Sequence, residues 1–456
     1  MIPLHIYHTN DLHSHFDYWP NIVHFLKQKR LNDQEKGEHS LTLELGDHMD
    51  RFHSLTEGTM GVGNVELMNQ AGYDYATIGN NEGVTFTKGG LETAYDVKQF
   101  DILLSNLFTV DGGRPEWSRP YVIHQLENNI SIGITAVTAP FYPFYSRLGW
   151  DVRDPWETLP SILDKLKEQT DIVIVMSHVG LFFDEALAQA RDDIDVIVGA
   201  HTHHLLKDGH NVNQTLIVQN GKHGQYAGEI NLLIDPEAKR IVQKKAMTYN
   251  MKQWPEDPET VQLLTSLQEK ADKRLEQPAM SLSETLETNW FRPSPLPELL
   301  ATALREWCHA DLSMINAGVI LDHLEAGPVN QADIHRICPH PINPVRVEVK
   351  GLDLVEAIET GLKTEFQHLE LKGLGFRGKM LGCLIFDQLT YQMEGERPVN
   401  IYVKDQPIDP DATYILATAD MFAFSQKLMP PVNRAQSIDF YLPEMLRDLL
   451  MWQLKK

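Results

Sequence analysis

The sequence is poor in cysteine, in positive charge and in long apolar runs. It holds three cysteines, Cys308, Cys338 and Cys383, and an odd number without a regular framework argues against an extracellular disulfide protein. No uncharged apolar run approaches the length of a membrane span. The start, Met1–His5, lacks a basic leader followed by an apolar stretch. We therefore expect a cytoplasmic protein without a membrane partner.

The shortage of positive charge also limits the possible ligands. Lys and Arg total 40 against 63 Asp and Glu, which gives a net charge of −23 over 456 residues. Such a surface repels nucleic acid polymers and anionic membranes. It also repels a small phosphorylated ligand, so a site for one needs local positive charge. Bound divalent metals are the obvious source of that charge.

The chain is too long for one ordinary core, which indicates two domains. In the first half, short runs rich in Val and Ile alternate with longer amphipathic stretches. This pattern predicts an α/β domain with buried strands and covering helices. Prolines interrupt the pattern before a predicted helix over Glu298–Trp307. We place the boundary there, with a first domain over residues 1–290 and a smaller α/β domain over residues 291–456.

Polar side chains follow several predicted strands at the point where each strand ends. In α/β sheets, ligand groups gather beyond the carboxyl ends of strands. Residues at such ends are therefore expected to meet in one site, although they are far apart in the sequence. In chain order, the predicted strands and the polar residues that follow them are Leu4–Thr9 with Asp11 and His13, Leu41–Leu45 with Asp47, Tyr75–Ile78 with Asn80, Ile172–Met176 with His178, and Val196–Val198 with His201 and His203.

These side chains form a donor set suited to metal ions. Carboxylate, imidazole and amide oxygen together suit a borderline divalent cation such as manganese, iron or zinc. The lack of a thiolate argues against a closed structural zinc site. The set is larger than one ion takes, and it fits two ions that share a bridging carboxylate. A pair of metals roughly 3.5–4 Å apart is a recurrent device for cleaving phosphoesters.

The ordered blocks around these residues resemble those of the calcineurin-like metallophosphoesterases. The stretch Asn64–Asp74, running into Asn80, is similar to the 5′-nucleotidase branch of that family. The resemblance implies a four-layer α/β/β/α sandwich followed by a substrate domain that rotates about an interdomain helix, for which Glu298–Trp307 is the candidate. The blocks are Asp11-Leu12-His13, Gly46-Asp47, Gly79-Asn80, Ser177-His178 and Gly199-Ala200-His201-Thr202-His203.

The same resemblance assigns the ligands. It implies that Asp11, His13 and His203 hold one metal ion and that Asn80, His178 and His201 hold the other. Asp47 would bridge the two ions. The implied activity is metal-dependent hydrolysis of a small phosphorylated substrate, most of all a nucleoside monophosphate.

The sequence departs from the family beside this site. Asn81 occupies the position of the family's catalytic histidine, and Val84 replaces the aspartate that pairs with it. Asn81 donates a hydrogen bond but supplies neither a proton nor positive charge. We take Asn81 and Asp47 as the catalytic candidates. Without a histidine at position 81 to protonate the leaving group, the rate of hydrolysis would fall by a factor on the order of 10²–10⁴. Alternative donors, by proximity in the sequence, are His15, His48 and His53.

The substrate residues are expected in the second domain. The family's Asn-Gly-Gly-Gly-Ile-Arg appears here as Asn316–Leu321, so Asn316 is kept and the arginine is lost. Arg336 is the candidate to replace it, with His335 and His340 as alternatives; a purely structural loop is equally open. An aromatic ring that stacks on a nucleobase contributes roughly 1–3 kcal/mol per base to the binding free energy. Phe376 is the first candidate ring, Arg377 and Lys379 lie beside it, and Phe422 or Phe424 is the second.

The favoured hypothesis is a hydrolase of phosphoesters in nucleotide-like substrates. A phosphodiesterase acting on cyclic nucleotides or nucleotide diphosphate derivatives is the alternative, since Asn81 and Leu321 point to a changed substrate. A hypothesis of another class is a metal- and nucleotide-binding module with little turnover.

Overall fold

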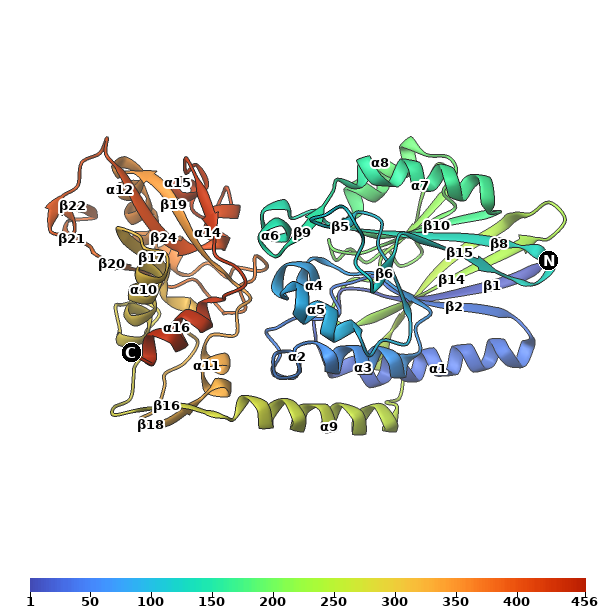
Figure 1. Cartoon of the computed structure of the whole chain (residues 1–456), viewed down its shortest axis with the longest axis horizontal. Coiled ribbons are helices and arrows are strands. Elements are labelled where there is room, and N and C mark those ends of the chain that lie inside the picture. The colour runs from blue at the N-terminus through green and yellow to red at the C-terminus, as the bar shows by residue number, and fades with distance from the viewer. The chain divides into compact units, whose positions relative to one another are not determined.

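Figure 1 shows the chain as a computed structural model. The structure describes residues 1–456, apart from the side chain of residue 128. The chain divides into two compact units, Met1–Ala271 and Asp272–Lys456. The boundary falls within the helix α9 (Pro258–Leu275), earlier in the chain than the expected division after residue 290.

The first unit is built on two sheets. One has the strand order β15 (Arg240–Asn250), β14 (Tyr226–Asp235), β1 (Ile2–Thr9), β2 (His39–Glu44), β3 (Tyr75–Ala76), β4 (Asp101–Leu103) and β6 (Ser118–Arg119). The other has the order β12 (His210–Val212), β13 (Thr215–Val218), β11 (Val196–Gly199), β10 (Ile172–His178), β8 (Ser131–Thr138) and β7 (Tyr121–Gln125). A separate pair joins β5 (Leu107–Thr109) and β9 (Trp150–Val152).

The two sheets pack face to face through their Val, Ile and Leu side chains. Leu4 and Ile6 of β1 belong to the same buried cluster as Ile132 of β8 and Ile174 of β10. Strands β1 and β2 pair in parallel, and so do β10 and β11. Parallel strands buried on both faces read as continuous apolar runs, which is why the sequence revealed them.

Helices cover the outer faces of this sandwich (Figure 1). α7 (Pro155–Gln169) and α8 (Leu181–Ala190) pack on the second sheet, where Leu163 and Leu166 meet Val173. α1 (Trp19–Lys36) and α3 (Val62–Ala71) lie on the side of the first sheet. The expected α/β/β/α sandwich is therefore confirmed. The other helices of this unit are α2 (Ser54–Thr59), α4 (Asn80–Thr85), α5 (Lys88–Tyr95) and α6 (Tyr142–Arg147).

The second unit has a central sheet with the order β20 (Leu384–Asp387), β17 (Leu312–Asn316), β24 (Thr413–Ala419), β19 (Pro344–Lys350) and β25 (Ile438–Phe440). Smaller sheets join β16 (Pro278–Leu282) to β18 (Gly327–Asn330), and β21 (Leu389–Glu394) to β22 (Arg397–Val403) and β23 (Gln406–Pro407). The helices are α10 (Pro295–Trp307), α11 (Gln331–Ile337), α12 (Gly351–Leu362), α13 (Thr364–Gln367), α14 (Asp420–Phe424), α15 (Pro430–Asn433) and α16 (Leu446–Leu454).

The helix expected to connect the domains lies inside this second unit. α10 packs against β17 and α16, and its Leu300 and Leu304 are fully buried. Among the described residues, no helix combines the length and the apolar composition that a membrane crossing requires.

Candidate metal centre

The loops after β1, β2, β10 and β11, together with the start of α4, bring the predicted ligands together. Ligand atoms of Asp11, His13 and His203 lie within 4.8 Å of one another. Those of Asp47, His178 and His201 form a second group with the same spread. The structure therefore assembles two groups of donors from residues that are far apart in the sequence.

Asp47 lies between the two groups. Its Oδ2 is 3.6 Å from His13 Nε2 in the first group and 3.4 Å from His178 Nε2 in the second. Asp11 faces the same space, with Oδ1 3.3 Å from His203 Nε2. A carboxylate that reaches both groups has the placement of a bridging ligand.

Two buried atoms at the site lack the hydrogen bonds that buried polar groups normally make. Asn80 Oδ1 and His178 Nε2 have no hydrogen-bond partner among the described atoms. His178 Nδ1 lies 2.6 Å from the carbonyl of Leu45. With Nδ1 engaged by that carbonyl, Nε2 is the ring nitrogen that is left to face a metal ion. These residues therefore fit a site for divalent cations.

The backbone of the ligand loops is strained. The φ angles of Asp11, His13, Asp47, His201 and His203 are 51°, 50°, 55°, 71° and 58°. This left-handed region costs non-glycine residues of order 1–3 kcal/mol each. These loops are also crowded at Gly79, where only glycine fits because a Cβ would lie 2.1 Å from Asp47 Oδ1. The fold thus places these side chains at a cost in stability, which is typical of a functional site.

Glu82 holds two of the ligand loops together. Its carboxylate accepts the backbone N–H groups of Asp47 at 3.0 Å, Gly79 at 2.9 Å and Met49 at 2.8 Å. Burial and the nearby Asp47 charge raise the pKa of Glu82 to about 7. The sequence pattern did not single out Glu82, although an acidic residue three positions after a helix N-cap is a recognisable capping signal.

The centre has a strongly negative potential that favours cations. Although burial acts to lower the pKa of His178, the Asp47 and Asp11 carboxylates raise it to about 10. Burial acts to raise the pKa of Asp47, but the His178 and His13 imidazoles bring it below its ordinary value. Both carboxylates are thus ionised at neutral pH, and they attract whatever positive charge reaches them.

Asn81 lies at the edge of this centre. Its N–H donates to Asp47 Oδ1 at 2.7 Å, and its side-chain Nδ2 lies 2.9 Å from His13 Nδ1 and 3.1 Å from Asp50 Oδ2. Asp50, which is 1% exposed, is a second residue that our sequence analysis missed. Nothing in its spacing from the other site residues distinguishes it from a loop carboxylate.

The histidines considered as alternative donors lie in different places. His48 is buried against Trp19, with ring centroids 4.9 Å apart. His53 caps the start of α2 by accepting the N–H of Leu55. His15 packs on His223, with centroids 3.7 Å apart, and His223 in turn lies 5.9 Å from the ring of His13. Of these three candidates, His15 is therefore the one linked through ring contacts to a ligand.

The substrate candidates of the second unit make contacts within that unit. The Phe376 ring is 3% exposed and stacks on His340 at 5.2 Å, and Phe422 is fully buried against Phe366 at 6.5 Å. Asn316 donates to the carbonyl of Leu381 at 2.9 Å.

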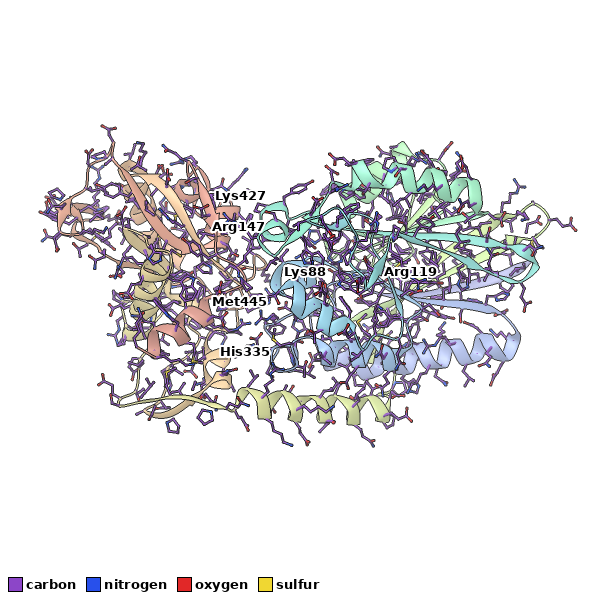
Figure 2. The ribbon with its side chains drawn as sticks, in the orientation of Figure 1. Lys88, Arg119, Arg147, His335, Lys427 and Met445 are labelled. Atoms are coloured by element: carbon purple, nitrogen blue, oxygen red, sulfur yellow. The ribbon has the colours of Figure 1, made fainter. Side chains whose placement is uncertain are left out.

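The charged candidates of that unit also have partners. Arg336 pairs with Asp322 at 2.6 Å, and the Arg377 guanidinium donates to the Phe376 carbonyl at 3.2 Å. His335 lies on α11 and is nearly buried (Figure 2). The roles of these residues toward a substrate stay predictions.

Comparison with known proteins gives a consistent result. Residues 4–205 match the family model of the calcineurin-like phosphoesterases, and residues 273–428 match that of the 5′-nucleotidase C-terminal domain. The chain is 42% identical over 457 residues to the uncharacterized metallophosphoesterase YunD of Bacillus subtilis (strain 168), with 99% of each chain covered.

Solved structures are similar in fold over the whole length. A putative 5′-nucleotidase from Staphylococcus aureus, in complex with alpha-ketoglutarate, matches with a TM-score of 0.71 and 18% identity, covering 99% of this chain and 96% of that one. The NAD nucleotidase of Haemophilus influenzae matches with a TM-score of 0.69 and 17% identity, covering 100% and 96%.

Proposed function

Because the chain belongs to the calcineurin-like metallophosphoesterase family, in its 5′-nucleotidase branch, we propose that it hydrolyses nucleoside monophosphates at a dinuclear metal centre. Members of this family are phosphoric ester hydrolases that use divalent metal ions. The observation that carries the proposal is the pair of donor groups on either side of Asp47. A packing role explains neither their strained loops nor the unpartnered Asn80 Oδ1.

The proposed ligands are those expected from the sequence. Asp11, His13 and His203 would hold one ion, Asn80, His178 and His201 would hold the other, and Asp47 would be shared by both. The chemistry of the donors suits manganese, zinc or iron.

The reaction follows from what these residues do around the substrate phosphate. Two divalent cations, when bound, polarise phosphoryl oxygens and lower the pKa of water. Asp11 and Asp47 would hold that positive charge at the site, where the strongly acidic chain would by itself repel a phosphate. Glu82 fixes the loops of Asp47 and Gly79, so the ligands need no rearrangement during the reaction. The Asn81 amide stabilises charge by a hydrogen bond, without transferring a proton.

A phosphodiesterase is the second candidate, and the residue that favours it is Asn81. A leaving group that needs no protonation tolerates the loss of an acid at this position. Diesters and phosphoanhydrides with stable leaving groups meet that condition better than nucleoside monophosphates.

The test is phosphate release by the full chain, stripped of metal and then reloaded with Mn²⁺. The substrates are nucleoside 5′-monophosphates, a 2′,3′-cyclic nucleotide and bis-p-nitrophenyl phosphate, with added phosphatase to reveal diester products. We expect manganese-dependent release from the monophosphates. Cleavage of the diesters alone would replace the nucleotidase by the phosphodiesterase. Uptake of two ions with no turnover of any substrate would contradict both and support a binding module.

A further inference from the structure

His13 has one ring nitrogen directed to the metal centre and one directed away from it. Nε2 lies 3.2 Å from His203 Nε2 and 3.6 Å from Asp47 Oδ2, so it faces the donor groups. Nδ1 lies on the opposite side of the ring, beside Asp50 and Asn81. A histidine that ligates a metal through Nε2 carries its proton on Nδ1 and needs an acceptor for it.

Of the two side chains beside His13 Nδ1, one can accept that proton. Asp50 Oδ2 is 3.4 Å away, and Asn81 Nδ2 is 2.9 Å away. The Asn81 amide nitrogen can only donate, and its orientation is set because Nδ2 donates to Asp50 Oδ2 while Oδ1 accepts from Asn80 at 3.2 Å. At 2.9 Å it donates to His13 Nδ1 only while that nitrogen carries no proton, so Asn81 has to turn away when the ring takes the Nδ1–H form of a metal ligand. The acceptor is therefore the Asp50 carboxylate.

The position of Asp50 is itself fixed by its surroundings. Its Oδ1 accepts the N–H of Phe52 at 3.0 Å, and its own N–H donates to Ser14 Oγ at 2.8 Å. Oδ1 is engaged by the backbone, and Oδ2 faces His13 Nδ1 and Asn81 Nδ2. Because the carboxylate is almost fully buried, water does not compete for it.

We propose that Asp50 is a positioning residue, which holds His13 with Nδ1–H toward its own carboxylate and Nε2 toward the metal ion. This inference rests on the proposed function, because it assumes that His13 is a ligand. The family's histidine–aspartate pair is lost at Asn81 and Val84, and Asp50 builds a different pair with His13. The carboxylate in this chain thus supports a metal ligand and does not support a free catalytic imidazole.

The first test measures metal binding in the absence of substrate. Asp50→Asn removes the acceptor charge with little change in shape, and Mn²⁺ titration of the metal-stripped full chain gives both affinities. We expect one ion to bind 10–100-fold more weakly, as roughly observed when such outer carboxylates are removed, and the other to be nearly unchanged. The matched control is Asp420→Asn, a 6% exposed carboxylate that accepts the backbone N–H of Asn343 at 3.1 Å in the second unit. It should leave both Mn²⁺ affinities unchanged.

A double substitution separates positioning from a general loss of structure. In a His13→Ala background the ring that Asp50 orients is absent, so Asp50→Asn should have almost no further effect on Mn²⁺ affinity. An undiminished effect in that background, or two unchanged affinities in Asp50→Asn alone, would overturn the proposal.

The second test needs no substitution and therefore does not depend on the folding of a variant. Nitrogen–proton correlation spectra of the histidine rings in the Zn²⁺-loaded chain should show His13 protonated on Nδ1, with slow exchange. A His13 ring protonated on Nε2, or one whose Nδ1 proton exchanges freely, would contradict the role of Asp50. Neither test uses turnover, so a loaded enzyme that hydrolyses nothing counts against the proposed function alone.

Discussion

The ligand loops of the first unit and the substrate loops of the second differ in how far their side chains are already satisfied. Around Asp47, two buried atoms lack partners and the backbone is strained. In the second unit, Phe376 stacks on His340 and Arg336 pairs with Asp322. Asn316 Oδ1 also lacks a partner, so the difference lies in the aromatic and charged candidates. The first site needs a ligand to complete it, whereas binding through Phe376 or Arg336 must displace internal contacts.

The sharpest way to break this comparison is Asp47→Asn. We expect kcat to fall roughly 10⁴-fold, because several kcal/mol of transition-state stabilisation depend on the bridged ions and each 1.4 kcal/mol is tenfold in rate. Circular dichroism should show the metal-stripped variant folded. Full activity in that folded variant would refute the bridging role of Asp47. It would also refute the inference that the first site needs bound ions to complete it.

Phe376→Ala tests the other side of the comparison. Removing a ring that is 3% exposed should lower the free energy of unfolding by about 3 kcal/mol, as measured by urea denaturation. Phe182→Ala, at a ring that is 82% exposed, is the matched truncation and should cost far less. Unchanged stability together with a raised KM would show instead that Phe376 leaves His340 and contacts substrate, as the sequence predicted.

A smaller effect is expected at His5 in β1, away from the ligand loops, where charged side chains are paired within the unit. His5 lies 3.5 Å from Glu229 and 3.1 Å from Glu38. The Glu229 carboxylate, against the opposing effect of burial, raises the pKa of His5 from 6.5 to about 9. A raised pKa in the folded state means that protonated His5 stabilises the fold fully below pH 6.5 and that this contribution is lost as the pH rises through 9.

The free energy of unfolding in urea is measured below pH 6.5 and again above pH 9. The wild type should lose ~1–2 kcal/mol more than His5→Gln, after allowance for partial exposure of the pair. His39→Gln, on the neighbouring strand β2, should keep the wild-type dependence. Equal losses in the wild type and in His5→Gln would show that this end of β1 is not held by its charges.

Much of the first unit was predictable from the sequence because local patterns and site chemistry coincide there. The apolar strands were predicted from their short runs of Val and Ile, and the polar residues after those strands meet in the structure. The long hairpin of β14 and β15 was not predicted, since polar residues such as Asn231 and Lys244 obscure its alternation.

The missing parts depend on contacts that no local pattern encodes. Asp50 gains its place from Ser14 and Asn81, which lie in other loops. The sequence predicted Phe376 as a ring that stacks on a base, but in the structure the ring stacks on His340. Such contacts across the sequence decide whether a polar or aromatic residue serves the fold or a ligand.

The spread of the proposed ligands along the chain has a consequence for assembly. Asp11 follows β1 in one sheet and His203 follows β11 in the other, so an ion held by both joins the two sheets at one edge. Such a cross-link closes a very long loop and stabilises the fold as a disulfide does, by about 5 kcal/mol in the chain-entropy estimate. A nascent chain that has not yet released residue 203 lacks that donor. Metal retention would therefore report that the loops after β1 and β11, one from each sheet, have met.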